Sequence, residues 1–369
     1  MRINLFFVFL FSAYFVDAQK RTLPESLEFK TFKLPKFPIA DFPKKSIPIS
    51  GIQVIQTLRD SIRFGYAMKG LDNHIVILVP EKPPTYFLQE GISKMYSSDF
   101  KPGGAHLLWV IKDLRLGEKI SFNQYAYLRF NADAYITKDL VTYKPVCTID
   151  TVFVNESGTD VTAWHGENIE NAFRLLLKKT IQNGKTVLEQ NTGGVSFEKI
   201  KENSNQQQDI PILNDQTYRE GAYADFNEFL QNKPSITNFR IFSIGRKKEI
   251  KIVKISENNR VDTVNIWGLC KGGEIYKCNE KLLVSIEKQG NGFIISNYIE
   301  QVARRNNGIF ISAFIGGLTG GLIVGLVSGS FVSSAGSDRI LVKSIPYITK
   351  TKKQPEATCL DMKTGELTF

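Results

Sequence analysis

The stretch QYAYLRFNADAY, from Gln124 to Tyr135, decides the fold of the central part of this chain. Two sets of side chains alternate along it: Tyr125, Tyr127, Arg129 and Asn131 on one side, and Ala126, Leu128, Phe130 and Ala132 on the other. A period of two is typical of an antiparallel strand with one buried face. The stretch therefore predicts a β-sheet at this point in the chain.

Outward from this strand, the pattern predicts a mixed α/β domain over residues 51–190. Further strands are expected at Ile62–Lys69, Ile75–Pro80, His106–Leu114 and Tyr143–Val154. Pro83-Pro84 favours the start of a helix at Thr85–Tyr96, because proline fits the first helical turn. A second helix is expected from Gly166 to Ile181, with Asn183-Gly184 as its stop.

A polar segment, residues 191–215, is rich in Asn and Gln and marks a domain boundary. Beyond it, residues 216–300 predict a small antiparallel β-meander, with turns at Asn258-Asn259, Gly272-Gly273 and Gly290-Asn291-Gly292. The predicted fold class is therefore α+β. It comprises an N-terminal mixed α/β domain with antiparallel strands and two helices, then the β-meander domain.

The first residues fit a cleavable secretion signal over residues 1–18. Arg2 precedes the apolar run Leu5–Phe15, and Val16-Asp17-Ala18 places small side chains before a cut at Gln19. The apolar run is shorter than the roughly 20 residues that a membrane span needs, which disfavours the alternative of an uncleaved anchor. Residues 19–50 are basic and rich in proline, so they are expected to form a tether or a solvated linker.

Glycines at every fourth position mark residues 308–334 as a predicted transmembrane helix. Gly317, Gly321, Gly325 and Gly329 stand in a stretch without charge and are the predicted helix-packing residues, a glycine zipper for self-association. Ile309–Val332 is long enough to cross a bilayer of about 30 Å. The alternatives are a buried helix of a globular domain or two short re-entrant pieces.

The tail, residues 335–369, is basic and predicts two features. Its lysines favour an orientation with the tail inside and the folded body facing the periplasm. Ala357 to Phe369 also has the pattern of a β-hairpin around the turn Lys363-Thr364-Gly365. Such a hairpin could instead return to the main domain, which conflicts with a single membrane span.

Three motifs in the second half carry a resemblance. GAYADFNEFLQNKPSI (Gly221–Ile236), WGLCKGGEIY (Trp267–Tyr276) and LDMKTGEL (Leu360–Leu367) resemble a family of uncharacterised exported bacterial proteins. That family shares G-x-Y-x-x-F-x-E-F, W-G-x-C-x-G and L-D-x-x-T-G-E motifs over about 150 residues. Lys271 stands where the family pattern usually has an acidic residue. The resemblance implies a β domain that includes the tail, and it implies no reaction.

Charge and cysteine content exclude some classes. The formal charge is +10, yet export and the lack of a nucleic-acid motif argue against nucleic-acid binding. Of the four cysteines, Cys270 and Cys278 are expected at opposite ends of a short strand, too far apart for a disulfide. Pairings of Cys147 or Cys359 stay open. The spacing of His and Cys indicates no metal site and no cofactor.

One polar cluster could carry chemistry, and it precedes the second helix: Asp160, Thr162, Trp164, His165 and Glu167. His165 beside an acidic group could act as a general base. The structural alternative is a helix start, in which Asp and Thr cap free N–H groups and Glu favours the helix dipole. The alternative is favoured, so no residue is predicted to be catalytic.

The sequence thus predicts a non-catalytic exported protein of the cell envelope, membrane-anchored, with a binding or assembly role. Its expected partners are membrane lipid, a second copy through the glycine-rich helix, and an envelope protein or glycan. The rival interpretation is a membrane-tethered hydrolase that uses the region of Asp160 and His165.

Overall fold

The strand at the centre of the sequence pattern is β6 (Gln124–Thr137), and it lies inside an eight-stranded sheet. The computed structural model describes residues 28–34, 47–58, 60, 62–70, 74–120, 123–190, 193–205, 209–244, 249–255, 261–280, 282–296, 342, 345, 348 and 353–369. The other members of this sheet are β1 (Glu28–Phe32), β2 (Ile49–Gln56), β3 (Gly65–Lys69), β4 (His74–Pro80), β5 (Ala105–Ile120), β7 (Thr142–Ser157) and β8 (Val195–Ser196).

The order of strands in this sheet is β1-β4-β3-β5-β6-β7-β8, and β2 also pairs with β5. β5, β6 and β7 are long antiparallel neighbours, whereas β2 runs parallel to the first half of β5 and β3 meets its second half at Leu116. Gly65 makes that meeting close: its φ is +136°, and a Cβ there would lie 1.8 Å from the Leu116 carbonyl oxygen. Glycine is therefore required where β3 joins β5.

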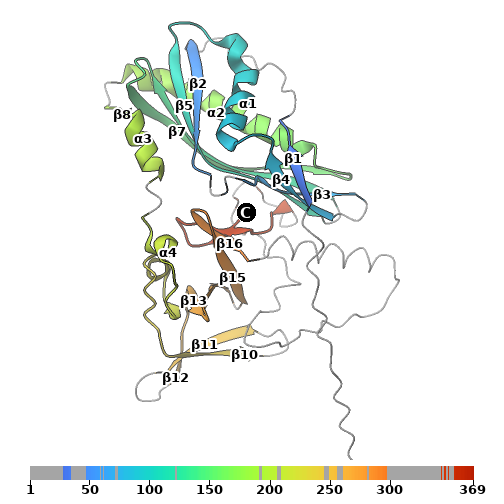
Figure 1. The fold of residues 1–369 in the computed structure, drawn as a ribbon, viewed down its shortest axis with the longest axis vertical. Helices are drawn as coiled ribbons and strands as arrows, with labels where there is room; N and C mark the ends of the chain where they lie inside the picture. The colour runs from blue at the N-terminus through green and yellow to red at the C-terminus, as the bar shows by residue number, and fades with distance from the viewer. Residues whose placement is uncertain are drawn as a thin grey trace, which may run out of the picture.

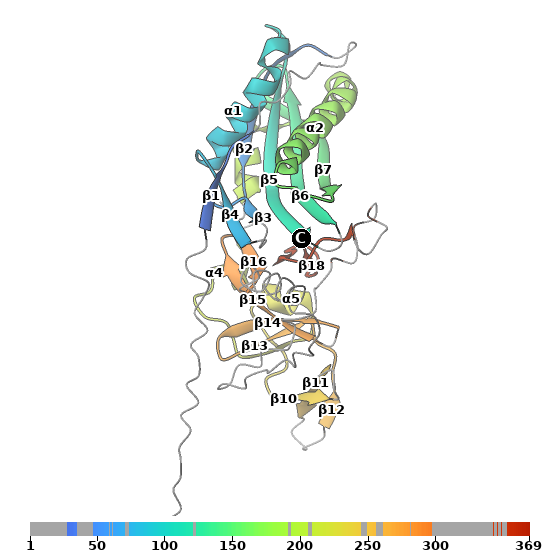
Figure 2. The ribbon, with the colours of Figure 1, turned by 90° about the vertical axis from the view of Figure 1, so that its right-hand side faces the viewer.

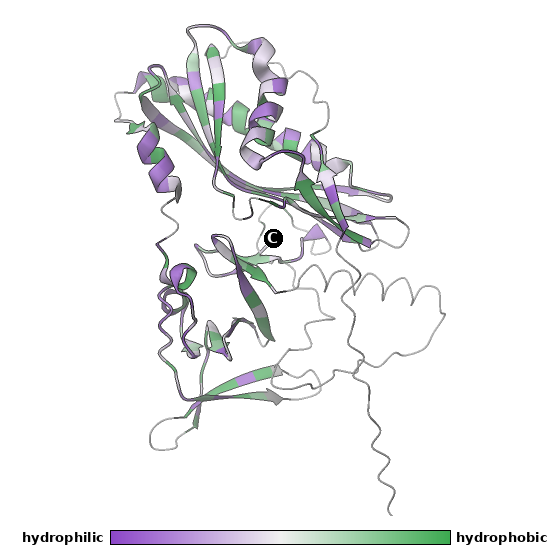
Figure 3. Cartoon of the chain, in the orientation of Figure 1, coloured by the Kyte–Doolittle hydropathy of each residue, from purple (hydrophilic) through white to green (hydrophobic). Residues whose placement is uncertain are grey.

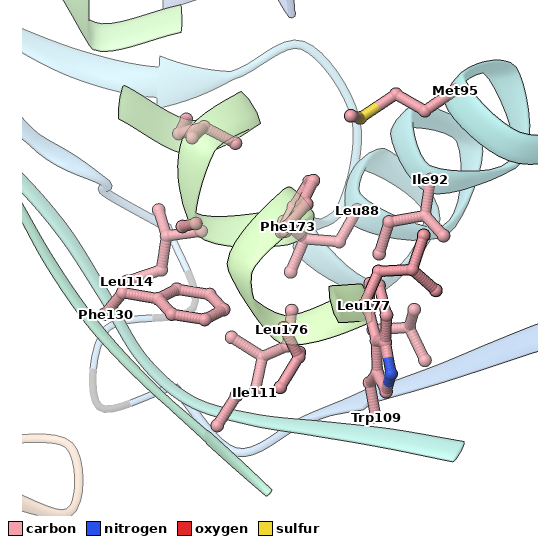
Figure 4. Packing of buried hydrophobic residues seen from close by; sticks show 14 of the residues in the cluster. Leu88, Ile92, Met95, Trp109, Ile111, Leu114, Phe130, Phe173, Leu176 and Leu177 are labelled. Carbon is pink, nitrogen blue, oxygen red and sulfur yellow. The ribbon is translucent and has the colours of Figure 1, made fainter. Parts of the chain in front are cut away.

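Helices α1 (Pro84–Tyr96) and α2 (Trp164–Glu189) cover one face of this sheet (Figure 2). Leu88 and Ile92 of α1 pack with Trp109 of β5, and Phe173 of α2 packs with Phe130 of β6 (Figure 4). The even-numbered residues of β6 point to this core, as the alternation of the sequence predicts. This is the largest hydrophobic core of the described chain.

The second half forms two smaller sheets. One has the order β18-β17-β16-β15-β14-β13-β9 and the other the order β10-β11-β12. Their bounds are β9 (Gly221–Tyr223), β10 (Phe239–Ile244), β11 (Glu249–Ile255), β12 (Val261–Thr263), β13 (Gly268–Lys271), β14 (Glu274–Asn279), β15 (Leu282–Gln289), β16 (Gly292–Ile295), β17 (Cys359–Leu360) and β18 (Leu367–Thr368). Short helices α3 (Phe197–Asn205), α4 (Pro211–Asn214) and α5 (Phe226–Leu230) precede or connect these strands.

The seven-stranded sheet lies next to the face of the eight-stranded sheet that the helices leave open, and the β10–β12 sheet lies at the far end of the molecule (Figure 1). Tyr125 and Tyr127 of β6 pack there with Ile295 of β16 and Phe369. The odd-numbered residues at the start of β6 are therefore buried too. The two halves therefore share a hydrophobic junction.

The predicted fold class was wrong in two respects. Of the described residues, 47% lie in strands and 24% in helices, and the large sheet is mixed and curled. No helix among the described residues is long and apolar enough to cross a membrane. The predicted helix-packing residues Gly317, Gly321, Gly325 and Gly329 lie outside the described residues, so the transmembrane helix and its glycine zipper have no support. The prediction of a helix rested on the apolar length of this segment. It gave less weight to the cost of its glycines, each of which destabilises a helix by about 1 kcal/mol relative to Ala.

Element boundaries also differ locally. Helix α2 does not stop at Asn183-Gly184 but continues to Glu189. Gly184 is instead a packing position: it is buried, and a Cβ added to it would lie 3.0 Å from Ile136 Cδ1. Part of the predicted tether is a strand, β1, paired with β4. The hairpin predicted for Ala357–Phe369 is confirmed, with Cys359 opposite Thr368. It joins the seven-stranded sheet through β16, so the tail belongs to the β domain.

Candidate functional site

The polar cluster predicted before the second helix divides into exposed and buried members. Asp160 is exposed, and its Oδ1 accepts a hydrogen bond from the Thr162 amide at 2.8 Å. Thr162 donates in turn to the Met68 carbonyl at 3.5 Å. Trp164 and Glu167 are exposed in the first turn of α2. Asp160 and Thr162 thus shape a turn ahead of α2. The N-cap of α2, Ala163, receives no side-chain hydrogen bond, so the predicted capping by Asp and Thr is wrong, whereas Glu167 does lie in the first turn.

His165 does not meet Asp160; it faces Glu118 of β5 instead. Its side chain is 0% exposed and that of Glu118 is 1% exposed, and His165 Nε2 lies 2.9 Å from Glu118 Oε1. The other carboxylate oxygen of Glu118 accepts the Met68 amide at 2.8 Å. Because the carboxylate accepts, Nε2 carries the proton of this hydrogen bond. The pair fastens the start of α2 to β3 and β5.

A buried His–Glu pair has the composition of a general base and its orienting group, but here it lacks access. His165 Nδ1 is buried and has no hydrogen-bond partner among the described residues. A water or substrate cannot reach it without opening the contact between α2 and the sheet. The pair therefore holds structure, and the exposed Asp160 carboxylate makes its hydrogen bond to the Thr162 amide instead.

The opposite face of β5 carries a second polar group. Arg115 pairs with Asp113 through two hydrogen bonds of 2.8 and 2.9 Å. Its Nη1 also donates to Cys359 Sγ at 2.5 Å and its Nη2 to the Phe369 carbonyl. Although burial alone would lower the pKa of the guanidinium, Asp113 and Cys359 beside it raise that pKa above its ordinary value.

Lys119 continues this contact toward the end of β5. It is buried, donates to the Gln354 carbonyl, and lies over the rings of Tyr125 and Tyr127 at 5.3 and 5.9 Å from their centroids. Tyr127 donates to the Lys353 carbonyl at 3.0 Å. We call these contacts of Arg115, Lys119 and Tyr127 with residues 353–369 the seam. Cations on β5 thus bind the main chain of the tail, with aromatic rings as additional partners.

Glu156 closes the edge of the seam from β7. Its carboxylate pairs with Lys353 and also accepts from Asn123 and, at 3.2 Å, from Tyr125. The hydrogen bond from Lys353, followed by that from Asn123, lowers the pKa of Glu156 to about 2.

The charge and alternation along KDLRLGEK (Lys112–Lys119) were the sequence signal that could have located the seam. If the strand is extended past Leu114, Asp113, Arg115 and Lys119 fall on one face and Glu118 on the other.

The three resemblance motifs meet in one aromatic core of the β domain. Phe229 stacks on Trp267 at 4.3 Å between centroids and contacts Tyr223 edge-on at 5.6 Å. The Trp267 indole donates to the Gly365 carbonyl at 3.0 Å. Gly365 has a φ of +73°, and a Cβ there would lie 2.5 Å from the Phe226 ring. Within this structure the aromatic motif residues and Gly365 pack against one another.

The cysteines and acidic residues form no further site in the described chain. Cys147, Cys270, Cys278 and Cys359 are free thiols. Burial raises the pKa of Cys270 to about 11 and also raises those of Cys147 and Cys278, which makes these thiols poor nucleophiles. Across the described ranges, no group of three or more His, Cys, Asp or Glu side chains is placed to hold a metal ion.

Comparisons with known proteins add little to this geometry. No family model and no curated protein matches the chain. Among solved structures, a Xanthomonas campestris protein described as DUF330 is 13% identical and aligns with 44% of this chain and 98% of its own, with a TM-score of 0.26. A protein described only as uncharacterized is 12% identical over 40% of this chain and 99% of its own, with a TM-score of 0.22. Likeness at this level carries no argument about fold or function.

Proposed function

We propose that this chain is a non-catalytic exported protein of the cell envelope whose role is binding or assembly. The observation that supports this most directly is the burial of His165 against Glu118. The rival, a hydrolase, needs His165 and Asp160 together and open to substrate. The two side chains are directed to different partners, and the histidine is enclosed.

Export is supported by the sequence of residues 1–18, which lies outside the described residues. A short basic start, an apolar run and small residues before the cut are the features that a signal peptidase reads. Sequencing of the N-terminus of the protein recovered from the envelope tests this. A mature chain that begins at Gln19 supports export, and a chain recovered from the cytoplasm with Met1 intact contradicts it.

The binding role is tested by capture from intact envelope. The full chain, crosslinked in place and purified, is expected to recover a saturable partner. In parallel, wild type and His165→Ala are assayed for hydrolysis of ester, amide and glycoside substrates. We expect no turnover from either protein. Turnover by wild type that His165→Ala abolishes, in a variant whose circular dichroism spectrum is unchanged, would establish the hydrolase instead.

A further inference from the structure

The three-stranded sheet β10–β12 has two unlike faces. Phe239, Ile241 and Ile252 point inward and pack with buried residues of the neighbouring sheet. Successive side chains of a strand alternate between faces, so Phe242 and its cross-strand neighbour Lys251 point outward. Phe242 is 45% exposed, and Val261 of β12 is 60% exposed. We call this outward side of β10–β12 the outer face.

Basic residues accompany the exposed apolar ones on the outer face. Arg240, two positions before Phe242, is exposed, and so is Lys251. Neither makes an ion pair with any residue that the structure describes. The three strands hold Arg240, Lys251 and Lys254 against Glu249 and Asp262, a net charge of +1 over the described residues of this sheet. Unpaired cations beside an exposed phenyl ring and a valine suit an anionic partner that also accepts apolar groups.

The position of this sheet suits a broad partner. β10, β11 and β12 lie at the end of the molecule opposite the eight-stranded sheet in both orthogonal views (Figures 1 and 2). Apolar residues mark β10 and β11 along most of their length (Figure 3). The outer face thus lies at the end of the described molecule away from the helices α1 and α2.

We propose that the outer face of β10–β12 docks onto an anionic lipid membrane. This inference rests on the proposed binding role and names its partner. Anionic headgroups attract Lys and Arg near the surface, while a phenyl ring enters the boundary between headgroups and acyl chains. The charge complementarity selects this occupant over a second copy of the chain, whose own outer face would carry the same positive charge.

The test is flotation of the full chain with vesicles of phosphatidylglycerol and phosphatidylcholine, compared with phosphatidylcholine alone. Wild type is expected to bind only the anionic vesicles, and less as salt is added. Arg240→Ala with Lys251→Ala is expected to weaken partitioning about 25-fold, since each cation near the surface contributes about fivefold. Phe242→Ser is expected to weaken it about fivefold through the lost apolar area.

Matched controls come from exposed residues elsewhere in the described chain. Tyr86→Ser on α1 removes an aromatic ring, and Lys101→Ala with Lys201→Ala removes two cations. These variants should bind as wild type does. Circular dichroism and thermal melting establish that each variant is folded, and the salt dependence of wild type gives a readout that needs no variant.

Three outcomes would overturn the inference. Binding to anionic vesicles that the outer-face variants leave unchanged would assign the contact to another basic region. If wild type has the mass of a dimer in solution and Phe242→Ser has the mass of a monomer, the outer face is an interface between copies of the chain. Failure to bind any vesicle, in a protein that still captures an envelope partner, would reject the lipid partner and leave the proposed binding role standing.

Discussion

Glu118 shows how one carboxylate can organise three segments of a chain. It accepts the Met68 amide of β3 and the His165 ring of α2, and the Glu118 carbonyl accepts the Tyr66 hydroxyl at 3.0 Å. Removal of one member of a buried pair leaves the other polar group without a partner and costs several kcal/mol. The pair therefore matters to the stability of the fold mainly because the loss of either partner leaves a buried polar group without a hydrogen bond.

The first prediction concerns this pair. Glu118→Ala should lower the free energy of unfolding by about 3 kcal/mol, because the Met68 amide and His165 Nε2 lose their acceptor. Urea unfolding followed by circular dichroism measures the change. Glu167→Ala, an exposed carboxylate in the first turn of the same helix, should change it by less than about 1 kcal/mol. Equal effects from both variants would contradict a special role for the pair.

The second prediction concerns Gly365. Gly365→Ala should destabilise the β domain by about 3 kcal/mol, because the new Cβ meets the Phe226 ring and the Trp267 indole while φ stays positive. Gly272→Ala is the matched control, with a φ of +63° and open space around it, and should cost about 1 kcal/mol. Tryptophan fluorescence during urea unfolding reports both. A Gly365→Ala protein as stable as the control would show that the aromatic core tolerates the methyl group.

At the scale of elements, β5 serves two cores with two faces. Leu114 and Leu116 pack under the helices, whereas Asp113, Arg115 and Lys119 face the tail. The seam thus depends on charged residues inside a long strand. A strand with one polar face normally meets water, and here the polar face meets the main-chain carbonyls of Gln354 and Phe369 and the Cys359 sulfur.

The third prediction concerns the seam. Arg115→Ala should increase amide hydrogen exchange in residues 358–369 by at least about tenfold, because the tail loses the hydrogen bonds to Cys359 and Phe369. Arg174→Ala, which removes an arginine paired with Glu170 on the surface of α2, should leave this exchange unchanged. Exchange measured by mass spectrometry distinguishes the two. Unchanged protection of β17 and β18 in Arg115→Ala would mean that strand pairing alone holds the tail.

Local patterns predicted the local elements. Alternation identified β6, the Pro83-Pro84 pair identified α1, and the Lys363-Thr364-Gly365 turn identified the tail hairpin. β2 was not predicted as part of the sheet, since its pairing with β5 joins residues far apart in sequence. Gly184 was interpreted as a helix stop because Asn-Gly is typical of helix ends. Its packing against Ile136, which lies 48 positions earlier in the chain, cannot be predicted from the residues around it. Polar groups that meet across the fold are the least predictable, as Glu118 with His165 and Arg115 with Cys359 show.

For the whole molecule, acid should loosen the junction between the two halves. The pKa of Glu156 is lowered to about 2 by Lys353 and then Asn123, below the value of about 4.3 expected in an unfolded chain. A carboxylate with a depressed pKa stabilises the fold above its unfolded pKa, and this contribution is lost as the pH falls through the folded value. The relevant window therefore lies between about pH 4.5 and pH 2.

The fourth prediction follows from that window. Wild type should melt at a higher temperature than Glu156→Gln at pH 6, and the difference should shrink to nothing as the pH approaches 2. Thermal melting at several pH values measures it. A difference that is the same at every pH would show that Glu156 acts through shape and hydrogen bonding rather than through its charge.

The distance along the chain between the partners of the seam has a consequence for biogenesis. Arg115 binds Cys359, which follows it by 244 residues, and Lys119 binds Gln354 after 235. During synthesis every strand of the large sheet therefore leaves the ribosome well before the carbonyls that cover Arg115 and Lys119. Until those residues arrive, two cations and two tyrosine rings stand uncovered in the nascent protein. Chaperones that recognise basic and aromatic surface would find a time-limited binding site there, one that the completed chain erases.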